Sequence, residues 1–289
     1  MHRHQNVRYF KQPINGGLDR DFDRAVELAT GEYCWLLPDD DLIKPGAIKT
    51  VLNSIQDGYF LMLLNCELVD ATTLQLLVRS TLDLTSNRVF APHETGDLFS
   101  ECWRLLNYIG CFVIRRKIWL ARERERYYGC DFIHVGVIFQ EPIPDSVLVI
   151  TEPLISVGIG NQGWLSRSYE IFMVNWPNVL ACLPLPPSAK SAATLPVDGW
   201  SGFFTLMWYR AFIAYSLVEY RRHIVPRLTD PFARIAPFVC AITPGVVANT
   251  ICILRNAFIS DKFRTSDTSF LRRSPVCCRL WRIKDSKVR

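Results

Sequence analysis

The chain of 289 residues lacks several motifs that would place it in a common class of protein. Its 10 cysteines include no C-x-x-C pair, which argues against a zinc ribbon or a redox dithiol. The first twelve residues contain no apolar segment of the signal-peptide type, so a reducing cytoplasm is the expected compartment. No helix-turn-helix, zinc or RNP pattern accompanies the basic residues, and nucleic acid is therefore not an expected partner.

Charge divides the sequence into two unlike regions. Residues 1–199 carry 18 Lys+Arg against 23 Asp+Glu, whereas residues 200–289 carry 15 against 5, giving net charges of −5 and +10. The first region has the composition of an acidic globular domain, and the second is basic and rich in aromatic side chains. The two regions are expected to meet different partners.

Alternating strand and helix patterns fill the first region. Apolar runs at 7–10, 33–37 and 59–65 predict strands, and apolar residues at helical spacing predict helices at 18–30 and from Pro45 onward. Residues 147–157 predict a pair of strands. This order is typical of an α/β sheet with helices on both faces, in which ligands bind beyond the carboxyl ends of the strands.

An acidic triplet, Asp39-Asp40-Asp41, follows the apolar strand at 33–37. Three adjacent carboxylates repel one another unless a positive charge lies among them. Mg²⁺ or Mn²⁺ bound to diphosphate oxygens would supply that charge, because these ions use one or two protein carboxylates and fill the other positions with phosphate and water. A solvated acidic loop is the alternative, and the position after a buried strand favours the metal.

A glycine turn, Asn15-Gly16-Gly17, precedes the helix expected at 18–30. Such a turn at a helix N-terminus can bind phosphate, but this one lacks the G-x-G-x-x-G spacing and the P-loop lysine. A plain helix cap at Asn15 is the alternative interpretation.

Taken together, these motifs resemble family 2 glycosyltransferases with the GT-A fold. The stretch from residue 15 to residue 48 reads N-G-G-L-D-R-D-F-D-R-A-V-E-L-A-T-G-E-Y-C-W-L-L-P-D-D-D-L-I-K-P-G-A-I. The residues that match the family pattern are Ala25, Ala29, Gly31, Glu32, Tyr33, Asp39, Asp40, Asp41 and Pro45. The variant W-L-x-x-D-D-D-L, the segment 129–135 and the loop G-N-x-x-W resemble abequosyltransferase-like enzymes of O-antigen synthesis.

The resemblance implies a GT-A-type mixed sheet flanked by helices, covering roughly residues 6–165. Family members begin with a strand like V-S-V-I-I-P-T-Y-N-R and further nucleotide-binding elements, which this sequence does not show, so an N-terminally shortened domain is expected. Asp21 also stands where the family often has a second Asn.

The resemblance further implies an inverting transfer from a nucleotide-sugar donor, dependent on Mn²⁺ or Mg²⁺. Asp39, Asp40 and Asp41 would bind the metal, and Asn15, Gly16, Asp39 and Asp40 would contact the donor. Asp131 is the first choice for the general base, His134 the second, and Glu101 and Glu141 follow. Asn161 and Trp164 of the glycine-rich loop would contact the acceptor sugar. The alternative for each of these residues is an ordinary cap, turn or packing role.

Three parts are expected in the whole chain: a GT-A-like domain at 1–183, a proline-rich linker at 184–198 and a basic helical tail at 199–289. Residues 235–254 carry no charge but contain two prolines, Pro237 and Pro244, and arginines flank them on both sides. Helices lying in a membrane interface, or a hairpin dipping into it, are favoured over a true span. A packed helical subdomain is the alternative. Peripheral association with the cytoplasmic face of a membrane is the expected location.

Three functions compete. The first is a metal-dependent, membrane-associated glycosyltransferase that acts on a lipid-linked or polysaccharide acceptor. The second is a catalytically inactive GT-A domain that serves as a scaffold or binding module. The third is a nucleotidyltransferase, which would be expected to have a glycine- and lysine-rich phosphate loop near its start.

Overall fold

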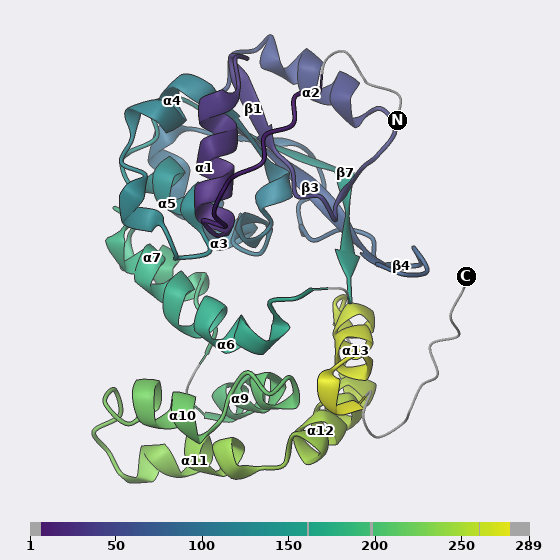
Figure 1. The fold of residues 1–289 in the computed structure, drawn as a ribbon, viewed down its shortest axis with the longest axis vertical. Helices are drawn as coiled ribbons and strands as arrows, with labels where there is room; N and C mark the ends of the chain where they lie inside the picture. The colour runs from purple at the N-terminus through teal and green to yellow at the C-terminus, as the bar shows by residue number, and fades with distance from the viewer. Residues whose placement is uncertain (1–6, 161, 197–198, 260, 278–289) are drawn as a thin grey trace.

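A seven-stranded mixed sheet organises the first part of the molecule (Figure 1). The computed structural model describes residues 7–160, 162–196, 199–259 and 261–277. The strands are β1 (Tyr33–Leu36), β2 (Leu42–Ile43), β3 (Leu61–Asp70), β4 (Leu76–Val78), β5 (Arg88–Phe90), β6 (Phe112–Arg115) and β7 (Val147–Ile159). The α/β architecture expected from the sequence is confirmed, and it is consistent with a GT-A arrangement.

The strand order is β1-β6-β3-β7-β2, with β4 paired to β3 and β5 paired to β7. Strand β6 runs antiparallel to both β1 and β3, and β3 is parallel to β7. Strands β1, β3 and β7 therefore share one direction, and their carboxyl ends lie at the same edge of the sheet. In Figure 1 the arrow of β7 points along this direction toward the helical part of the molecule.

Two strand predictions need correction, and β2 was not predicted. Residues 7–10 form no strand, and their side chains are exposed. Residues 147–157 form one long strand instead of a pair: Leu64 pairs with Ile150 and Cys66 with Ile155, so residues 151–154 bulge out of β7. Strand β2 was not expected, because two exposed residues carry no alternation of apolar and polar side chains.

Helices cover the sheet: α1 (Leu18–Leu28), α2 (Ala47–Ile55), α3 (Thr95–Cys102), α4 (Arg116–Ala121), α5 (Ile133–Phe139), α7 (Trp176–Cys182) and α8 (Pro187–Ala192). Helix α1 packs against α4 and α5 (Figure 1). Asp19 and Asp23 of α1 are buried, although acidic side chains on a helix are usually exposed. Helix α8 replaces part of the expected linker, and its Ala189 packs against Gly96 of α3.

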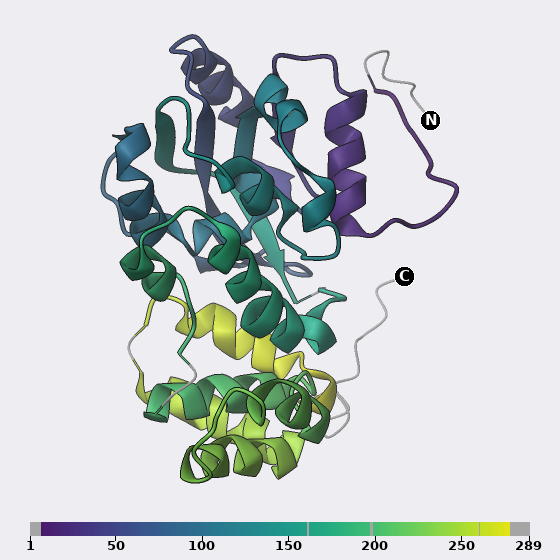
Figure 2. The same ribbon diagram turned by 90° about the vertical axis from the view of Figure 1, so that its left-hand side faces the viewer.

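A second hydrophobic core lies among the remaining helices, which are α6 (Ser168–Glu170), α9 (Gly199–Ala211), α10 (Leu217–Glu219), α11 (Ile235–Ile242), α12 (Gly245–Phe258) and α13 (Arg264–Arg272). Phe172 and Phe270 pack against both cores. Helix α13 lies between the sheet and the other helices in both views (Figures 1 and 2). Its end is fixed to the sheet by an ion pair between Arg273 and Asp70, the last residue of β3.

Helices α11 and α12 divide the uncharged stretch at 235–254. Within the described residues, no single helix is long and apolar enough to cross a bilayer. The segments Phe232–Ile242 and Gly245–Phe258 pass that test only together, and they are bent by 104° where they meet. Thr243 and Pro244 stand at the bend, because proline cannot continue the helix that precedes it.

Candidate functional site

The acidic triplet lies at the carboxyl edge of the sheet. The chain leaves β1 at Leu36 and enters β2 at Leu42, which pairs with Ser156 of β7 on the opposite side of the sheet. The triplet therefore passes across the ends of the central strands. Its position agrees with the general location of ligand sites in α/β sheets.

The triplet lies beside two glycines, and one of them, Gly110, leaves space that a side chain would fill. A Cβ atom at Gly110 would lie 2.6 Å from Oδ2 of Asp41, and one at Gly158 would lie 3.4 Å from the carbonyl oxygen of Asp40. Sequence reasoning did not single out Gly110, whose lack of a side chain leaves the space that the Asp41 carboxylate occupies. The only sequence signal was a glycine inside an apolar run before a strand.

The charge of the triplet is not balanced by the protein. Asp39 and Asp40 are exposed and Asp41 is half-buried. Burial, together with the nearby charge of Asp40, raises the pKa of Asp41 to about 7. Among the described residues no Lys or Arg forms an ion pair with any of the three carboxylates. Within the described residues, the triplet therefore has no ion-pair partner.

A divalent cation fits the chemistry of these side chains, because Mg²⁺ and Mn²⁺ prefer carboxylate oxygens. The described part of the chain holds no cluster of three His, Cys, Asp or Glu side chains arranged to bind an ion. The protein therefore offers one or two carboxylates at this place, and the other ligands would come from diphosphate oxygens and water.

Asp131 stands in a constrained loop before α5. Its backbone φ is +65°, a left-handed conformation that is uncommon outside glycine. Its Oδ2 atom accepts hydrogen bonds from Nδ2 of Asn175 at 2.9 Å and from a guanidinium nitrogen of Arg167 at 3.2 Å. The carboxylate is thus held by two side chains from the segment that follows the glycine-rich loop, and its side chain remains 20% exposed.

The buried carboxyl group of Asp19 holds this loop from the other side. Its two oxygens accept hydrogen bonds from the backbone N–H groups of Asp131, at 3.0 Å, and Ile133, at 3.2 Å. Burial raises the pKa of Asp19, and the backbone hydrogen bonds partly oppose that shift. The partners of Asp19 are more than 110 residues away in the chain, which is why helical periodicity could not reveal its role.

The contacts of His134 show where the Asp131 loop lies relative to the triplet. His134, the second residue of α5, packs edge-on against Phe112, the first residue of β6, at 4.8 Å between ring centroids. Gly110, which faces Asp41, lies two residues before Phe112. The start of α5 and the triplet therefore lie over the same end of β6. Within the described residues no hydrogen bond or ion pair joins Asp131 to the triplet.

His134 occupies the core. Its side chain is buried, its Nε2 atom lies 2.9 Å from the carbonyl oxygen of Leu106, and burial lowers its pKa to about 4. Its position favours a packing role over contact with diphosphate or metal. The other two candidate bases are engaged at the surface: Glu101 accepts two hydrogen bonds from Arg88, and Glu141 lies 4.0 Å from Arg122.

The glycine turn and the glycine-rich loop remain open to solvent where they are described. Oδ1 of Asn15 accepts the N–H of Gly17, so Asn15 shapes the turn, while Gly17 occupies the cap position of α1. Gly16 is exposed beside Arg20. Trp164 is 38% exposed and packs edge-on against Phe172. Asn161 lies outside the described residues.

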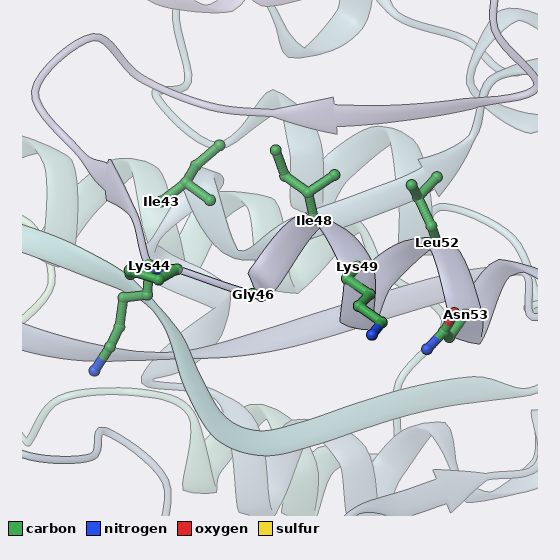
Figure 3. A pocket seen from close by; sticks show the side chains of 8 residues that line it. Ile43, Lys44, Gly46, Ile48, Lys49, Leu52 and Asn53 are labelled. Atoms are coloured by element: carbon green, nitrogen blue, oxygen red, sulfur yellow. The ribbon is translucent and has the colours of Figure 1, made fainter.

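One groove on the surface is lined by residues outside the triplet. It has a volume of about 590 Å³ and lies between β2 and α2. Figure 3 shows Ile43, Ile48 and Leu52 projecting to the same side of this groove. Val51 on the neighbouring face of α2 is buried, whereas Ile48 and Leu52 are exposed.

An acidic loop at the carboxyl edge of an α/β sheet lies where ligands of such sheets usually bind. Residues 1–122, which contain α1, β1 and the triplet, match the glycosyl transferase family 2 model. This part of the chain is therefore similar to glycosyltransferase family 2, the family that the sequence motifs resemble.

A curated protein supports the same assignment. Abequosyltransferase RfbV of Salmonella typhimurium (strain LT2) is 26% identical over 144 residues, which cover 46% of this chain. The matched part spans 42% of that protein's length, so less than half of the relative is represented.

Proposed function

We propose that this chain transfers a sugar, with inversion of configuration, from a nucleotide-sugar donor to a lipid-linked or polysaccharide acceptor. The observation that carries the proposal is the acidic triplet at the carboxyl edge of the sheet, inside the segment that matches the family. An abequosyltransferase among the relatives favours a deoxyhexose donor.

The triplet accounts for donor binding in this proposal. Asp41 and one of its two neighbours would hold Mn²⁺ or Mg²⁺ against the donor diphosphate. A bound divalent ion offsets the negative charge that develops on the departing nucleoside diphosphate. The lack of any Lys or Arg partner for the triplet supports this role, because a permanent ion pair would compete with the cation.

In this proposal, Asp131 is the base that takes the proton of the acceptor hydroxyl. When the acceptor hydroxyl attacks the anomeric carbon, the bond between that carbon and the diphosphate oxygen breaks, and a carboxylate takes the hydroxyl proton. Asp131 is held by Asn175 and Arg167 on one side and, through its backbone, by Asp19 on the other. A carboxylate fixed in this way loses little entropy when it accepts the proton.

The test measures release of nucleoside diphosphate from a panel of nucleotide sugars. The full chain should release it with Mn²⁺ and a glycan-lipid extract present, and EDTA should stop the release. Asp131→Asn should lower turnover by about 10²–10⁴-fold, the usual contribution of a general base, and leave donor affinity unchanged. Glu125→Gln, at an exposed site, is the matched control.

Two results would contradict the proposal. Transfer that proceeds equally well in EDTA would remove the metal from the reaction. Donor binding without turnover in the unmodified chain would favour the inactive scaffold instead.

A further inference from the structure

Exposed apolar side chains gather on one face of α11. The residues involved are Phe232, Ile235, Phe238, Val239 and Ile242. Phe232 lies in the short turn just before α11. Successive members of the set are one or three residues apart, which places them along a single stripe of the helix. The opposite face of α11 carries Pro237, Cys240 and Ala241, which are buried, and the last two belong to the second core. The side chains on the inner face of α11 thus pack in the core, whereas those on the outer face are exposed.

Helix α12, which follows the 104° bend, also exposes apolar side chains. Its Val247, Leu254 and Phe258 are exposed and again fall at spacings of three to four and seven residues, while Ala248 and Cys252 face the core. We call the eight exposed residues of the two helices the apolar corner. In Figures 1 and 2, α11 lies at the end of the molecule farthest from the sheet.

The polar side chains within the apolar corner hydrogen-bond to their own helices. The hydroxyls of Thr243 and Thr250 donate to the carbonyl oxygens of Val239 and Val246, at 2.7 and 3.0 Å. Neither hydroxyl therefore needs water as a hydrogen-bond acceptor. These two hydroxyls therefore add little to the free-energy cost of moving this surface into a less polar environment.

Positive charge surrounds the apolar corner. Residues 199–259 contain six arginines, against only Glu219 and Asp230 as acids. Arg221 and Arg222 are exposed on a short helical turn that packs against α11, where the rings of Tyr220 and Phe238 are 5.6 Å apart. Arg255 is exposed on α12, next to Leu254.

We propose that the apolar corner docks onto an anionic lipid bilayer and lies within its interface. An apolar stripe flanked by arginines is complementary to lipid headgroups over acyl chains. The bend and the length of the two helices place the surface along the membrane and not across it. The sheet would then stand on the aqueous side, above the helical part.

The charge distribution argues against a second copy of the chain as the occupant. Pairing this face with itself would bring the arginines of two copies together, and like charges across an interface are unfavourable. Anionic lipid has the opposite charge. The inference is independent of the proposed sugar transfer, because it concerns a surface on the far side of the helical part from the acidic triplet.

The experiment measures partition of the full chain onto vesicles, without donor or acceptor. Binding should be strong to phosphatidylcholine vesicles that contain a quarter phosphatidylglycerol, and weak to phosphatidylcholine alone. Ile235→Ser with Ile242→Ser should weaken the partition at least tenfold, because two exposed apolar side chains no longer enter the interface. Arg221→Gln with Arg222→Gln should weaken it about tenfold or more at low salt, and much less at high salt.

A matched control exists on the sheet part. Ile48→Ser with Leu52→Ser removes side chains that are 57% and 56% exposed, against 56% and 51% for Ile235 and Ile242. The control should bind vesicles as the unmodified chain does. Far-ultraviolet circular dichroism of each variant confirms folding, and the arginine pair decides the question if the isoleucine pair does not fold.

Three outcomes would overturn the proposal. The first is equal partition of the control and isoleucine variants. The second is binding that does not depend on anionic lipid. The third is a dimer, seen by light scattering, that the Ile235 and Ile242 changes dissociate, since that would make the apolar corner a contact between copies.

Discussion

The sheet part and the helical part of this chain differ in the kind of side chain that lies in an environment usually unfavourable for it. The sheet part buries acidic side chains and gives each one a partner: Asp19 holds the Asp131 loop, and Asp23 accepts hydrogen bonds from Trp119 and Tyr128. The helical part exposes large apolar side chains in a row along α11, in addition to those, such as Ile48 and Leu52, that the sheet part exposes. The first pattern fixes the geometry of a site, and the second provides a surface for another phase or molecule.

The two parts nevertheless share side chains, and truncation of each core tests whether they unfold together. Phe99→Ala in the first core and Phe212→Ala in the second should each lower the free energy of unfolding by about 3–5 kcal/mol, the usual cost of removing a buried phenyl ring. Because Phe172 and Phe270 pack against both cores, we expect one calorimetric transition that both variants shift. Two transitions, each sensitive to one variant, would show independent domains.

Acid should weaken the sheet part through His134. Burial lowers the pKa of this residue from 6.5 to about 4, so the folded state binds its proton less tightly than the unfolded state. The stability that His134 contributes is complete above pH 6.5 and is lost as the pH falls toward 4, by about 3 kcal/mol at most.

Urea unfolding at several pH values measures this loss. His134→Gln keeps a hydrogen-bond donor near Leu106 but does not titrate, so its free energy of unfolding should fall less between pH 6.5 and 4. An identical pH dependence in the variant and the unmodified chain would contradict the assignment.

The pH dependence of stability that comes from Asp267 on α13 should have the opposite sign to that of His134. Burial, with a smaller contribution from Asp261, raises its pKa from 3.8 to about 6, while Arg104 and Arg255 oppose the shift. Tyr108 and Cys252 are also within its electrostatic reach. The folded state binds this proton more tightly, so stability is lost as the pH rises from 3.8 to 6.

Asp267→Asn should therefore stabilise the chain at pH 7 by roughly 1–2 kcal/mol and have little effect at pH 4. Thermal unfolding at the two pH values measures the difference. Asp261→Asn, which removes only the repulsion, should give a smaller gain, and a loss of stability in Asp267→Asn at pH 7 would refute the expected sign.

Local pattern revealed the elements that have strong local signals. Strand β1, helix α1 and the triplet were found because an apolar run, helical spacing and an acidic break are readable within a few residues. The division of residues 235–254 at Thr243 and Pro244 followed from proline, although the bend itself depends on packing.

The remaining features depend on contacts between distant residues. The bulge at 151–154 exists because β7 must match β3, where Asn65 binds the carbonyl oxygen of Thr151. The burial of Asp19 depends on N–H groups of the Asp131 loop. The role of Gly110 depends on the Asp41 carboxylate, which occupies the space that a side chain at Gly110 would fill. No periodicity within one element contains such information.

The central claim is that the acidic triplet binds a divalent cation together with a nucleoside diphosphate. Isothermal titration of the full chain with a panel of nucleoside diphosphates measures it most directly, in Mn²⁺ and then in EDTA. The account predicts binding that requires Mn²⁺ and that is lost in Asp41→Asn but retained in Asp57→Asn, an exposed acid beyond α2. Equal binding in EDTA, or full binding by Asp41→Asn, would contradict it.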